Sequence, residues 1–312
     1  MQNQLICIVG PTASGKTALS VALAQMRGTE IISADSMQIY IGMDIGTAKP
    51  SITERQGIPH HMLDICPPEE HFSVARYVEL ADCCAQDILR RGMVPIVCGG
   101  TGLYLDALIA GNTFCGDEAL PELRHTLNQI AAEQGNLAVH AMLEKVDPIG
   151  AAKLHPNNLK RVIRALEVYH QTGMTLDALN EKNRRAVPKY QSVKIGICPA
   201  KREVLYERIH ARIEHMLEEG LLAEIETLFQ QGKLTGTAAQ AIGYKEYIPY
   251  FRGEASLKDC TEQLKQNSRN YAKRQLTWLR RDAAIHWVYY DSASQFDEAL
   301  RHSTEILTAS GL

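Results

Sequence analysis

Short apolar runs alternate with longer amphipathic stretches in the first half of the chain. The runs Leu5–Val9, Glu30–Ala34 and Val94–Cys98 have the length of strands, and Thr17–Met26 and Ser73–Arg91 between them have helical spacing. Strands that alternate with helices form a parallel sheet with helices on both faces, and such sheets bind ligands at the carboxyl ends of their strands. We therefore predict an α/β fold with its site at that edge.

Helical patterns replace the strand-like runs from about residue 113 to residue 189. They are separated by glycines and an Asp-Pro pair, and cover Leu120–Glu133, Asn136–Val146, Asn157–Tyr169 and Thr175–Asn183. Strand signals return at Ser192–Cys198 and Ile285–Tyr290, with long helical stretches at Arg202–Gln231 and Ser256–Arg281 between them. We predict a core domain of residues 1–112 and 190–312, with an inserted all-helical subdomain at 113–189.

The composition is that of an ordinary folded protein, because 45% of the 312 residues are hydrophobic and 22% are charged. No apolar run approaches the roughly 20 residues of a membrane span, and Leu5–Val9 has no basic flank, so we expect a first strand, no signal peptide and no membrane partner. The net charge of −3 means that any site for a polyanion must be local. The eight cysteines form no C-x-x-C pair, which favours a reducing, cytoplasmic location.

The segment after the first predicted strand matches the phosphate-binding pattern G-x-x-x-x-G-K-[ST], and a predicted helix follows it. Its members are Gly10, Pro11, Thr12, Ala13, Ser14, Gly15, Lys16 and Thr17. Glycines let backbone N–H groups turn toward an anion, the helix N-terminus adds partial positive charge, and Lys16 neutralises terminal phosphate oxygens. We expect Thr17 to hold Mg²⁺. The pattern predicts a P-loop NTPase-like sheet and a phosphorylated ligand, but leaves open whether the phosphate is transferred, hydrolysed or released.

Asp35 follows the second predicted strand, at the same sheet edge as the phosphate-binding loop. Asp35 is therefore a candidate to contact the ligand. Alternatively, it caps the next helix or binds magnesium. The strand Val94–Cys98 runs into Gly99-Gly100-Thr101-Gly102 with no acid at its end, where many nucleoside-triphosphate hydrolases carry one. This absence weakens the hydrolase interpretation, and the lack of an N-K-x-D sequence argues against a GTPase.

Longer motifs follow one another along the chain. Besides the phosphate-binding loop they comprise Ile32–Ser36 with Gln38 and Tyr40, Asp44–Pro50, His60-His61 with Leu63-Asp64, Phe72-Ser73, Gly99–Tyr104 and Arg274–Trp278. Together these motifs resemble the tRNA dimethylallyltransferase family, also called the IPP transferase family, from residue 5 to about residue 281. The last cysteine is Cys260, so we expect the bacterial form, without the C-terminal zinc finger of the eukaryotic one.

The resemblance implies a Mg-dependent prenyltransferase. Such an enzyme transfers the dimethylallyl group of dimethylallyl diphosphate to the exocyclic N6 amine of the tRNA adenine just 3′ of the anticodon, and releases diphosphate. The P-loop then holds a leaving group, and Arg212 is expected to join the residues that bind it. The matching acid of the family is the general base, so Asp35 is expected to take the amine proton, with Thr101 and Lys16 beside the reacting groups.

A polyanionic RNA needs local positive charge on a slightly acidic protein. Residues 265–281 carry Lys and Arg but no acid, Leu264, Tyr271 and Trp278 predict a buried stripe, and further basic clusters lie at 153–164 and 182–189. The family's tRNA contacts correspond here to Asp35, Ser36, Met37, Gln38, Thr101, Arg124, Lys160, Arg161, Val162, Ile163, Arg164, Gln240, Gly243, Tyr244, Lys245, Lys273, Arg274, Gln275, Trp278 and Arg280. We expect a monomer that takes an extruded adenine of the anticodon stem-loop into a channel between core and insertion.

Three alternatives remain open. An adenylate isopentenyltransferase uses the same allyl donor, but it leaves the basic clusters and the helical insertion without a purpose. A small-molecule P-loop kinase could use Asp35 as a base toward a hydroxyl, but it explains neither Gly99–Tyr104 nor the basic helices. A non-catalytic RNA-binding regulator is disfavoured because Lys16, Thr17 and Thr101 are all present.

Overall fold

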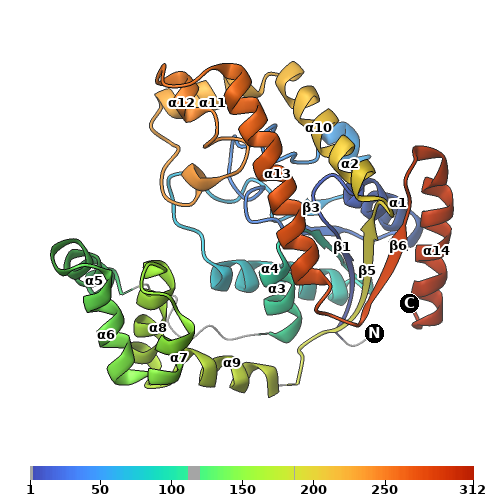
Figure 1. The fold of residues 1–312 in the computed structure, drawn as a ribbon. Helices are drawn as coiled ribbons and strands as arrows, with labels where there is room; N and C mark the ends of the chain where they lie inside the picture. The colour runs from blue at the N-terminus through green and yellow to red at the C-terminus, as the bar shows by residue number, and fades with distance from the viewer. Residues whose placement is uncertain (1–2, 112–119, 186) are drawn as a thin grey trace. The chain divides into compact units, whose positions relative to one another are not determined.

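The computed structural model describes residues 3–111, 120–185 and 187–312. Contacts between residues divide the chain into two compact units, Met1–Ile109 with Lys189–Leu312, and Ala110–Pro188. The larger unit holds a sheet flanked by helices, and the described part of the smaller unit is helical (Figure 1). The expected start of the insertion at residue 113 lies outside the described residues.

Within the described residues of the larger unit, six parallel strands form one sheet in the order β3-β2-β4-β1-β5-β6. They are β1 (Gln4–Val9), β2 (Ile31–Ser33), β3 (His60–His61), β4 (Ile96–Gly99), β5 (Gln191–Cys198) and β6 (Ile285–Tyr289). Val9 at the end of β1 lies opposite Gly99 of β4 and Gly196 of β5. Because β1, β2 and β4 run the same way, their carboxyl ends meet at one edge, and the predicted P-loop NTPase-like α/β fold is confirmed.

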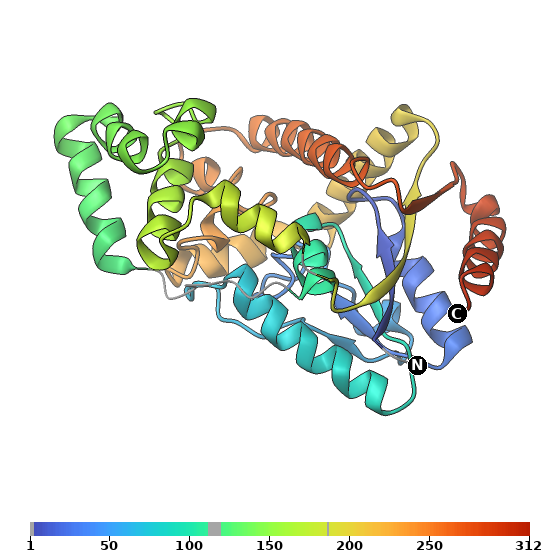
Figure 2. The ribbon, with the colours of Figure 1, turned by 90° about the horizontal axis from the view of Figure 1, so that it is seen from below.

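Helices cover both faces of this sheet (Figures 1 and 2). Alternate residues of β1 point to opposite faces, so that Leu5, Cys7 and Val9 lie in one apolar cluster and Ile6 and Ile8 in the other. The first cluster is closed by α3 (Val74–Arg90), α4 (Gly102–Ala110), α10 (Arg202–Glu218), α11 (Leu221–Gln230) and α13 (Leu257–Leu279), and the second by α1 (Lys16–Arg27) and α14 (Phe296–Ala309). Short elements complete the unit: α2 (Ile52–Arg55), α12 (Ile248–Phe251) and the 3-10 turns Ala238–Gln240 and Ala293–Gln295. No helix in the described ranges combines the length and apolar character needed to span a bilayer.

Several predicted elements differ from those observed. Gly220, with a left-handed φ of 102°, divides the predicted helix Arg202–Gln231 into α10 and α11. The two-residue strand β3 is too short to give a periodic pattern. The helix α4 is short and mostly apolar, with an exposed Leu103 beside its one charged residue, Asp106, so it lacks the amphipathic spacing by which helices are predicted.

The smaller unit has an apolar core of its own. Its described helices are α5 (Pro121–Gln134), α6 (Asn136–Val146), α7 (Pro148–Lys153), α8 (Leu159–Thr172) and α9 (Leu176–Arg185). Leu127, Val139, Leu143 and Leu166 lie at the centre of the core. The predicted break at Asp147-Pro148 is also the start of α7, where the Asp147 side chain accepts a hydrogen bond from Gly150 N at 2.8 Å.

A buried carboxylate lies on α8 in this unit. Glu167 is fully buried and accepts two hydrogen bonds of 2.8 Å from the guanidinium group of Arg124, and Arg164 lies 3.7 Å from it. Bidentate pairs of this kind hold both partners in a defined geometry. Arg124 and Arg164 therefore compensate the buried charge of Glu167. This structural role was not part of the prediction from sequence, which gave both residues only a contact with RNA.

The segment 160–164 presents two kinds of side chain. Val162 and Ile163 are buried in the core of the smaller unit, whereas Lys160 and Arg161 are exposed. The helical repeat of 3.6 residues turns the middle of this segment inward. This corrects the sequence-based assignment of the whole segment to tRNA contact, because the side chains of Val162 and Ile163 do not reach the surface. The side chains of Arg184 and Arg185, from the third basic cluster, lie outside the described part.

We predict that Arg124→Met lowers the local stability of the smaller unit by about 2 kcal/mol, because it leaves Glu167 buried with only the more distant Arg164. Native-state hydrogen exchange of the α8 amides in the full chain measures this, since the two units need not unfold together. Arg161→Met, an exposed change on the same helix as Glu167, should shift the exchange by less than about 0.5 kcal/mol. Equal protection in the two variants would contradict the role of the ion pair.

Candidate active site

The phosphate-binding loop joins β1 to α1 at the carboxyl edge of the sheet. A Cβ atom at Gly10 would overlap the carbonyl oxygen of Ile197, and one at Gly15, whose φ is 91°, would overlap the hydroxyl of Tyr290. Tyr290 donates a hydrogen bond from that hydroxyl to the carbonyl oxygen of Ser14 at 3.1 Å. The two glycines therefore permit both the close packing of the loop and the exposure of its N–H groups to an anion.

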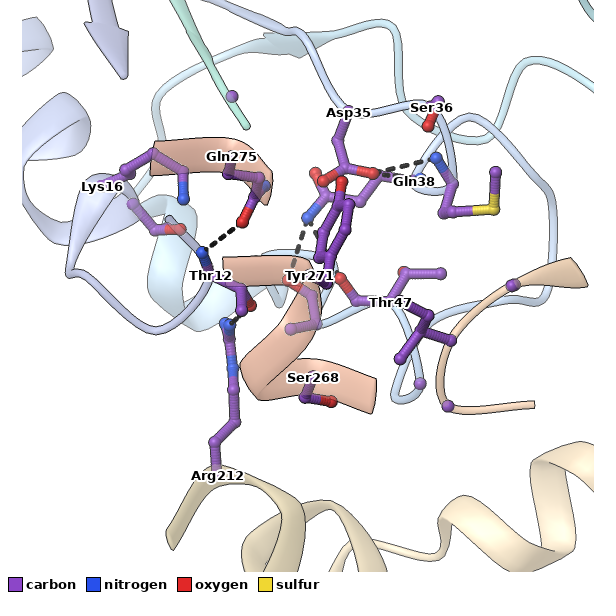
Figure 3. A pocket seen from close by; sticks show the side chains of 18 of the residues that line it. Thr12, Lys16, Asp35, Ser36, Gln38, Thr47, Arg212, Ser268, Tyr271 and Gln275 are labelled. Atoms are coloured by element: carbon purple, nitrogen blue, oxygen red, sulfur yellow. Dashed lines mark hydrogen bonds between the residues drawn. The ribbon is translucent and has the colours of Figure 1, made fainter. Parts of the chain in front are cut away.

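Two cations face this loop. Lys16 Nζ donates to the carbonyl oxygen of Pro11 at 2.7 Å, and burial lowers the pKa of Lys16 to about 8. Arg212 of α10 donates from Nη1 to the hydroxyl of Thr12 at 3.1 Å, and burial also lowers its pKa (Figure 3). Among the described residues the Ser14 hydroxyl is buried without a hydrogen-bond partner. A phosphate group would offset the positive charge and supply oxygens for this hydroxyl.

Gln275 of α13 connects the phosphate-binding loop with the loop that follows β4. Its Oε1 accepts a hydrogen bond from Thr12 N at 2.8 Å, as Figure 3 shows, and its Nε2 donates to Gly100 O at 3.1 Å. A Cβ atom at Gly100 would overlap this amide. Because Gln275 is only 6% exposed and both of its amide atoms are engaged, the structure gives it a positioning role, and the tRNA contact expected from the sequence stays a prediction.

Asp35 lies just beyond the end of β2, in a turn that its own carboxylate stabilises. Asp35 Oδ1 accepts hydrogen bonds from Met37 N at 2.9 Å and Gln38 N at 3.4 Å. Thr101 Oγ1 accepts a further bond from Ser36 N at 3.1 Å, so the loop after β4 holds the same turn. The structure therefore brings together Asp35 and Thr101, which the sequence places 66 positions apart.

Tyr271 of α13 stands beside the carboxylate of Asp35 (Figure 3). Burial and the nearby negative charge of Asp35 raise the pKa of Tyr271. The phenol therefore stays neutral and able to donate a hydrogen bond next to the carboxylate. From its sequence spacing Tyr271 is predicted only as part of a buried stripe, and its place beside Asp35 is not predicted.

A cavity of about 310 Å³ extends between these groups. The polar side chains that line it include Thr12, Lys16, Thr17, Asp35 and Arg212. An apolar wall is formed by Ile209, Ile213 and Met216 of α10 with Leu264 of α13. Two of the three predicted catalytic residues, Lys16 and Asp35, thus line one cavity, and Thr101 supports its edge through Ser36.

Two irregular segments complete the lining of this cavity, Gly46–Ala48 and the chain from Gln240 to Lys245. Tyr244 is the exception within the second segment: its side chain is fully buried and donates a hydrogen bond to Glu224 at 2.6 Å. The predicted tRNA contacts that do line the cavity are Asp35, Ser36, Met37, Gln38, Gln240, Gly243, Lys245, Arg274 and Gln275.

The buried stripe predicted for α13 is wrong at Trp278. Leu264 is buried, but Trp278 is 40% exposed, packs over Gly102 and donates from Nε1 to Asp106 at 2.9 Å. The buried face of this helix includes Leu264, Ser268, Gln275 and Leu279. A seven-residue spacing falls behind a straight helix by about 20° per repeat, which contributes to moving Trp278 from the core to the rim.

Part of the positive charge on α13 is engaged within the protein. Lys265 pairs with Glu214 at 2.7 Å and with Glu262 at 3.1 Å, and Arg269 contacts His210. The exposed cations that follow on the helix and at its C-terminal end are Lys273, Arg274, Arg280 and Arg281. The exposed positive charge therefore lies toward the C-terminal half of α13, where Arg274 lines the cavity.

The apolar wall and the role of Tyr290 were not predicted from the sequence. The spacing of Ile209, Ile213 and Met216 marks one face of α10, but such spacing is the same for a helix that lines a cavity and for one that fills a core. Tyr290 follows β6 and reaches Ser14 across 276 positions of sequence, a contact for which no local pattern exists.

A parallel sheet with a glycine-rich loop between β1 and α1 defines a P-loop protein of the α/β class. The model of the family described as IPP transferase matches residues 38–282, and that described as isopentenyl transferase matches residues 3–66. The chain belongs to the IPP transferase family, and the resemblance predicted from its motifs is confirmed.

Relatives of similar length support this membership. The tRNA dimethylallyltransferase of Geobacillus thermodenitrificans is 50% identical over 95% of this chain and 93% of its own length. The crystal structure of a tRNA delta(2)-isopentenylpyrophosphate transferase from Staphylococcus epidermidis is 41% identical, with a TM-score of 0.71 over 99% of each chain. A crystal structure of a eukaryotic dimethylallyltransferase acting on tRNA is 32% identical, with a TM-score of 0.84 over 97% of this chain and 78% of that one.

We predict that binding of inorganic pyrophosphate weakens about tenfold between pH 7 and pH 9, because Lys16, with its pKa lowered to about 8, loses its positive charge in this range. Isothermal titration calorimetry measures the dissociation constant. Lys16→Arg is the matched control, since an arginine stays charged at both pH values and the ionisation of the probe itself affects both proteins equally. The same pH dependence in the two proteins would contradict the assignment to Lys16.

Proposed function

We propose that this chain transfers the dimethylallyl group of dimethylallyl diphosphate to the N6 amine of the tRNA adenine adjacent 3′ to the anticodon, with release of diphosphate. The observation that carries this proposal is the cavity that joins the phosphate-binding loop, with Lys16 and Arg212, to the carboxylate of Asp35 along an apolar wall. Relatives named tRNA dimethylallyltransferase support tRNA as the acceptor.

The donor end is suited to departure of a diphosphate. As the allylic C–O bond breaks, its electron pair moves to the diphosphate oxygen, and the backbone N–H groups of the loop stabilise this charge together with Lys16 and Arg212. Both cations are already held against the loop through Pro11 and Thr12, so little reorganisation is needed. The apolar wall of Ile209, Ile213, Met216 and Leu264 offers a surface for the hydrocarbon part of the donor.

The residues present fit Mg²⁺ at this end. Thr17 lines the cavity directly after Lys16, and Mg²⁺ commonly keeps several waters and takes its other ligands from one or two protein oxygens and the substrate phosphates. Thr17 and the diphosphate oxygens would hold the ion. Bound there, Mg²⁺ would neutralise charge on the leaving diphosphate.

The acceptor end is suited to taking up a proton. The N6 amine forms the new C–N bond and must lose one proton, which Asp35 accepts. Two backbone amides hold Asp35 Oδ1, so the orientation of the carboxylate is set before the substrate binds. Tyr271 beside it provides an aromatic ring and a neutral hydroxyl at the place where the base would enter.

The RNA is proposed to bind as its anticodon stem-loop, to a monomer in the cytoplasm. The adenine must leave the stack to reach Asp35, as bases do in other enzymes that act on them. Lys273 and Arg280 on α13, and Lys160 and Arg161 on the smaller unit, are exposed cations that suit contacts to RNA phosphates.

We expect mass spectrometry of nucleosides from unmodified tRNA to show a dimethylallyl adduct on adenosine after incubation with the protein, Mg²⁺ and dimethylallyl diphosphate. The same incubation with ATP in place of the allyl donor should give none. An adduct on free AMP but not on tRNA would indicate an adenylate isopentenyltransferase. Consumption of ATP without any adduct would contradict prenyl transfer and favour a kinase.

We predict that Asp35→Asn lowers kcat at least about 100-fold with little effect on tRNA affinity, because the amide oxygen can still accept the bonds that form the turn but the side chain cannot take a proton. Single-turnover transfer and filter binding measure the two quantities. Asp297→Asn in the first turn of α14 removes the same charge far along the chain, and should retain full activity. Equal turnover by the Asp35 variant and the unchanged protein would exclude Asp35 as the base.

A further inference from the structure

Two irregular segments form part of the cavity wall, Gly46–Ala48 and the chain around Gln240–Lys245. Both are built largely of turns, which lack the regular hydrogen bonds that hold a helix or a strand. Irregular backbone next to a site keeps a defined shape only if other groups satisfy its N–H donors. For the N–H groups of residues 44–46 the acceptor is Glu224 of α11, whereas the N–H of Gly243 donates to the nearby Glu246 at 2.9 Å.

Glu224 of α11 binds both segments with one carboxylate. Its Oε2 accepts hydrogen bonds from the backbone N–H groups of Asp44 at 3.0 Å and Ile45 at 2.8 Å, and its Oε1 accepts from Gly46 N at 3.1 Å. Oε1 also accepts from the hydroxyl of Tyr244 at 2.6 Å. Three successive amides that converge on one anion form a nest, and bonds to a charged acceptor are about twice as strong as neutral ones.

The two segments are also fitted to each other. A Cβ atom at Gly46 would overlap the ring of Tyr244, and a Cβ atom at Gly243 would lie 2.9 Å from Gly46 O. The φ of Gly243 is 103°, a value that side chains disfavour. Burial and the negative charge of Glu224 raise the pKa of Tyr244, so its hydroxyl remains a donor to the carboxylate. All these contacts form together only when the two segments occupy one relative position.

Other parts of the site have separate anchors. The phosphate-binding loop is held by Gln275 and Tyr290, and the turn of Asp35 is held by its own carboxylate and by Thr101. Loss of the Glu224 contacts would therefore act on the wall of the cavity and spare the two ends. Gln38 Nε2 also donates to the backbone oxygens of residues 47 and 48, which keeps the loop attached when Glu224 is changed.

We infer that Glu224 is a positioning residue for the acceptor: from α11 it sets the relative position of Gly46–Ala48 and Gln240–Lys245, and so the shape of the wall that receives the RNA base. The inference rests on the proposed transfer to tRNA, because Glu224 itself is not among the residues that line the cavity. It explains why an acid stands at this position of α11 and why glycine occupies both 46 and 243.

The test is Glu224→Gln, which keeps the size of the side chain but places an amide NH₂ against backbone N–H donors. We expect the KM for tRNA to rise about tenfold with kcat changed less than about threefold, and the dissociation constant for inorganic pyrophosphate to remain unchanged. Glu226→Gln, an exposed change two positions along the same helix, is the matched control and should keep the KM of the unchanged protein. Tyr244→Phe removes one of the four bonds and should raise the KM about threefold.

An unchanged KM in Glu224→Gln would overturn the inference. A parallel loss of tRNA and pyrophosphate binding, with a lower melting temperature, would also overturn it, because that result shows a general structural role. If Glu224→Gln does not fold, the KM of Tyr244→Phe decides, and a value equal to that of the unchanged protein counts against the inference. Absence of transfer by the unchanged protein would instead refute the proposed function.

Discussion

The hydrogen bonds of Gln275 are the contacts on which the arrangement of the site depends. One side-chain amide holds Thr12 in the phosphate-binding loop and Gly100 in the loop after β4, and both loops end strands of the same sheet. The second loop in turn holds the turn of Asp35 through Thr101. The helix that carries Gln275 also brings Tyr271 and the exposed Arg274 to the same cavity. The anion-binding end and the carboxylate end are thereby aligned by one helix.

Charge is used differently in different parts of this slightly acidic chain. Buried or partly buried carboxylates serve the architecture, since Glu167 holds Arg124 and Glu224 holds three backbone amides and Tyr244. The cations at the phosphate-binding loop are partly buried, and desolvation lowers their pKa values. Because charged groups interact more strongly where water is excluded, this division places strong positive potential at the loop despite a net charge of −3.

Local sequence patterns predicted which residues supply the chemistry of the site, but they predicted less well which residues hold them in place. The glycines, Lys16 and Asp35 were identified because a phosphate-binding loop and a strand end have characteristic short sequences. The positioning role of Gln275 was not predicted and the predicted burial of Trp278 was wrong, because both depend on how α13 is rotated over the sheet. Glu224 was missed because an acid in the first turn of a helix is common, and the backbone amides that it binds lie about 180 positions away.

The sequence by itself determined the α/β class, the phosphate-binding loop and the family, because each of these depends on the order of residues along a short stretch or on motifs in series. Only the tertiary structure decided which of the basic and polar side chains face the cavity, which compensate buried charges and which hold loops in register. Those outcomes depend on the packing of helices against a sheet, where a rotation of a few tens of degrees moves a side chain from the core to the rim. Packing of this kind is a property of segments that are distant in sequence, so no local pattern encodes it.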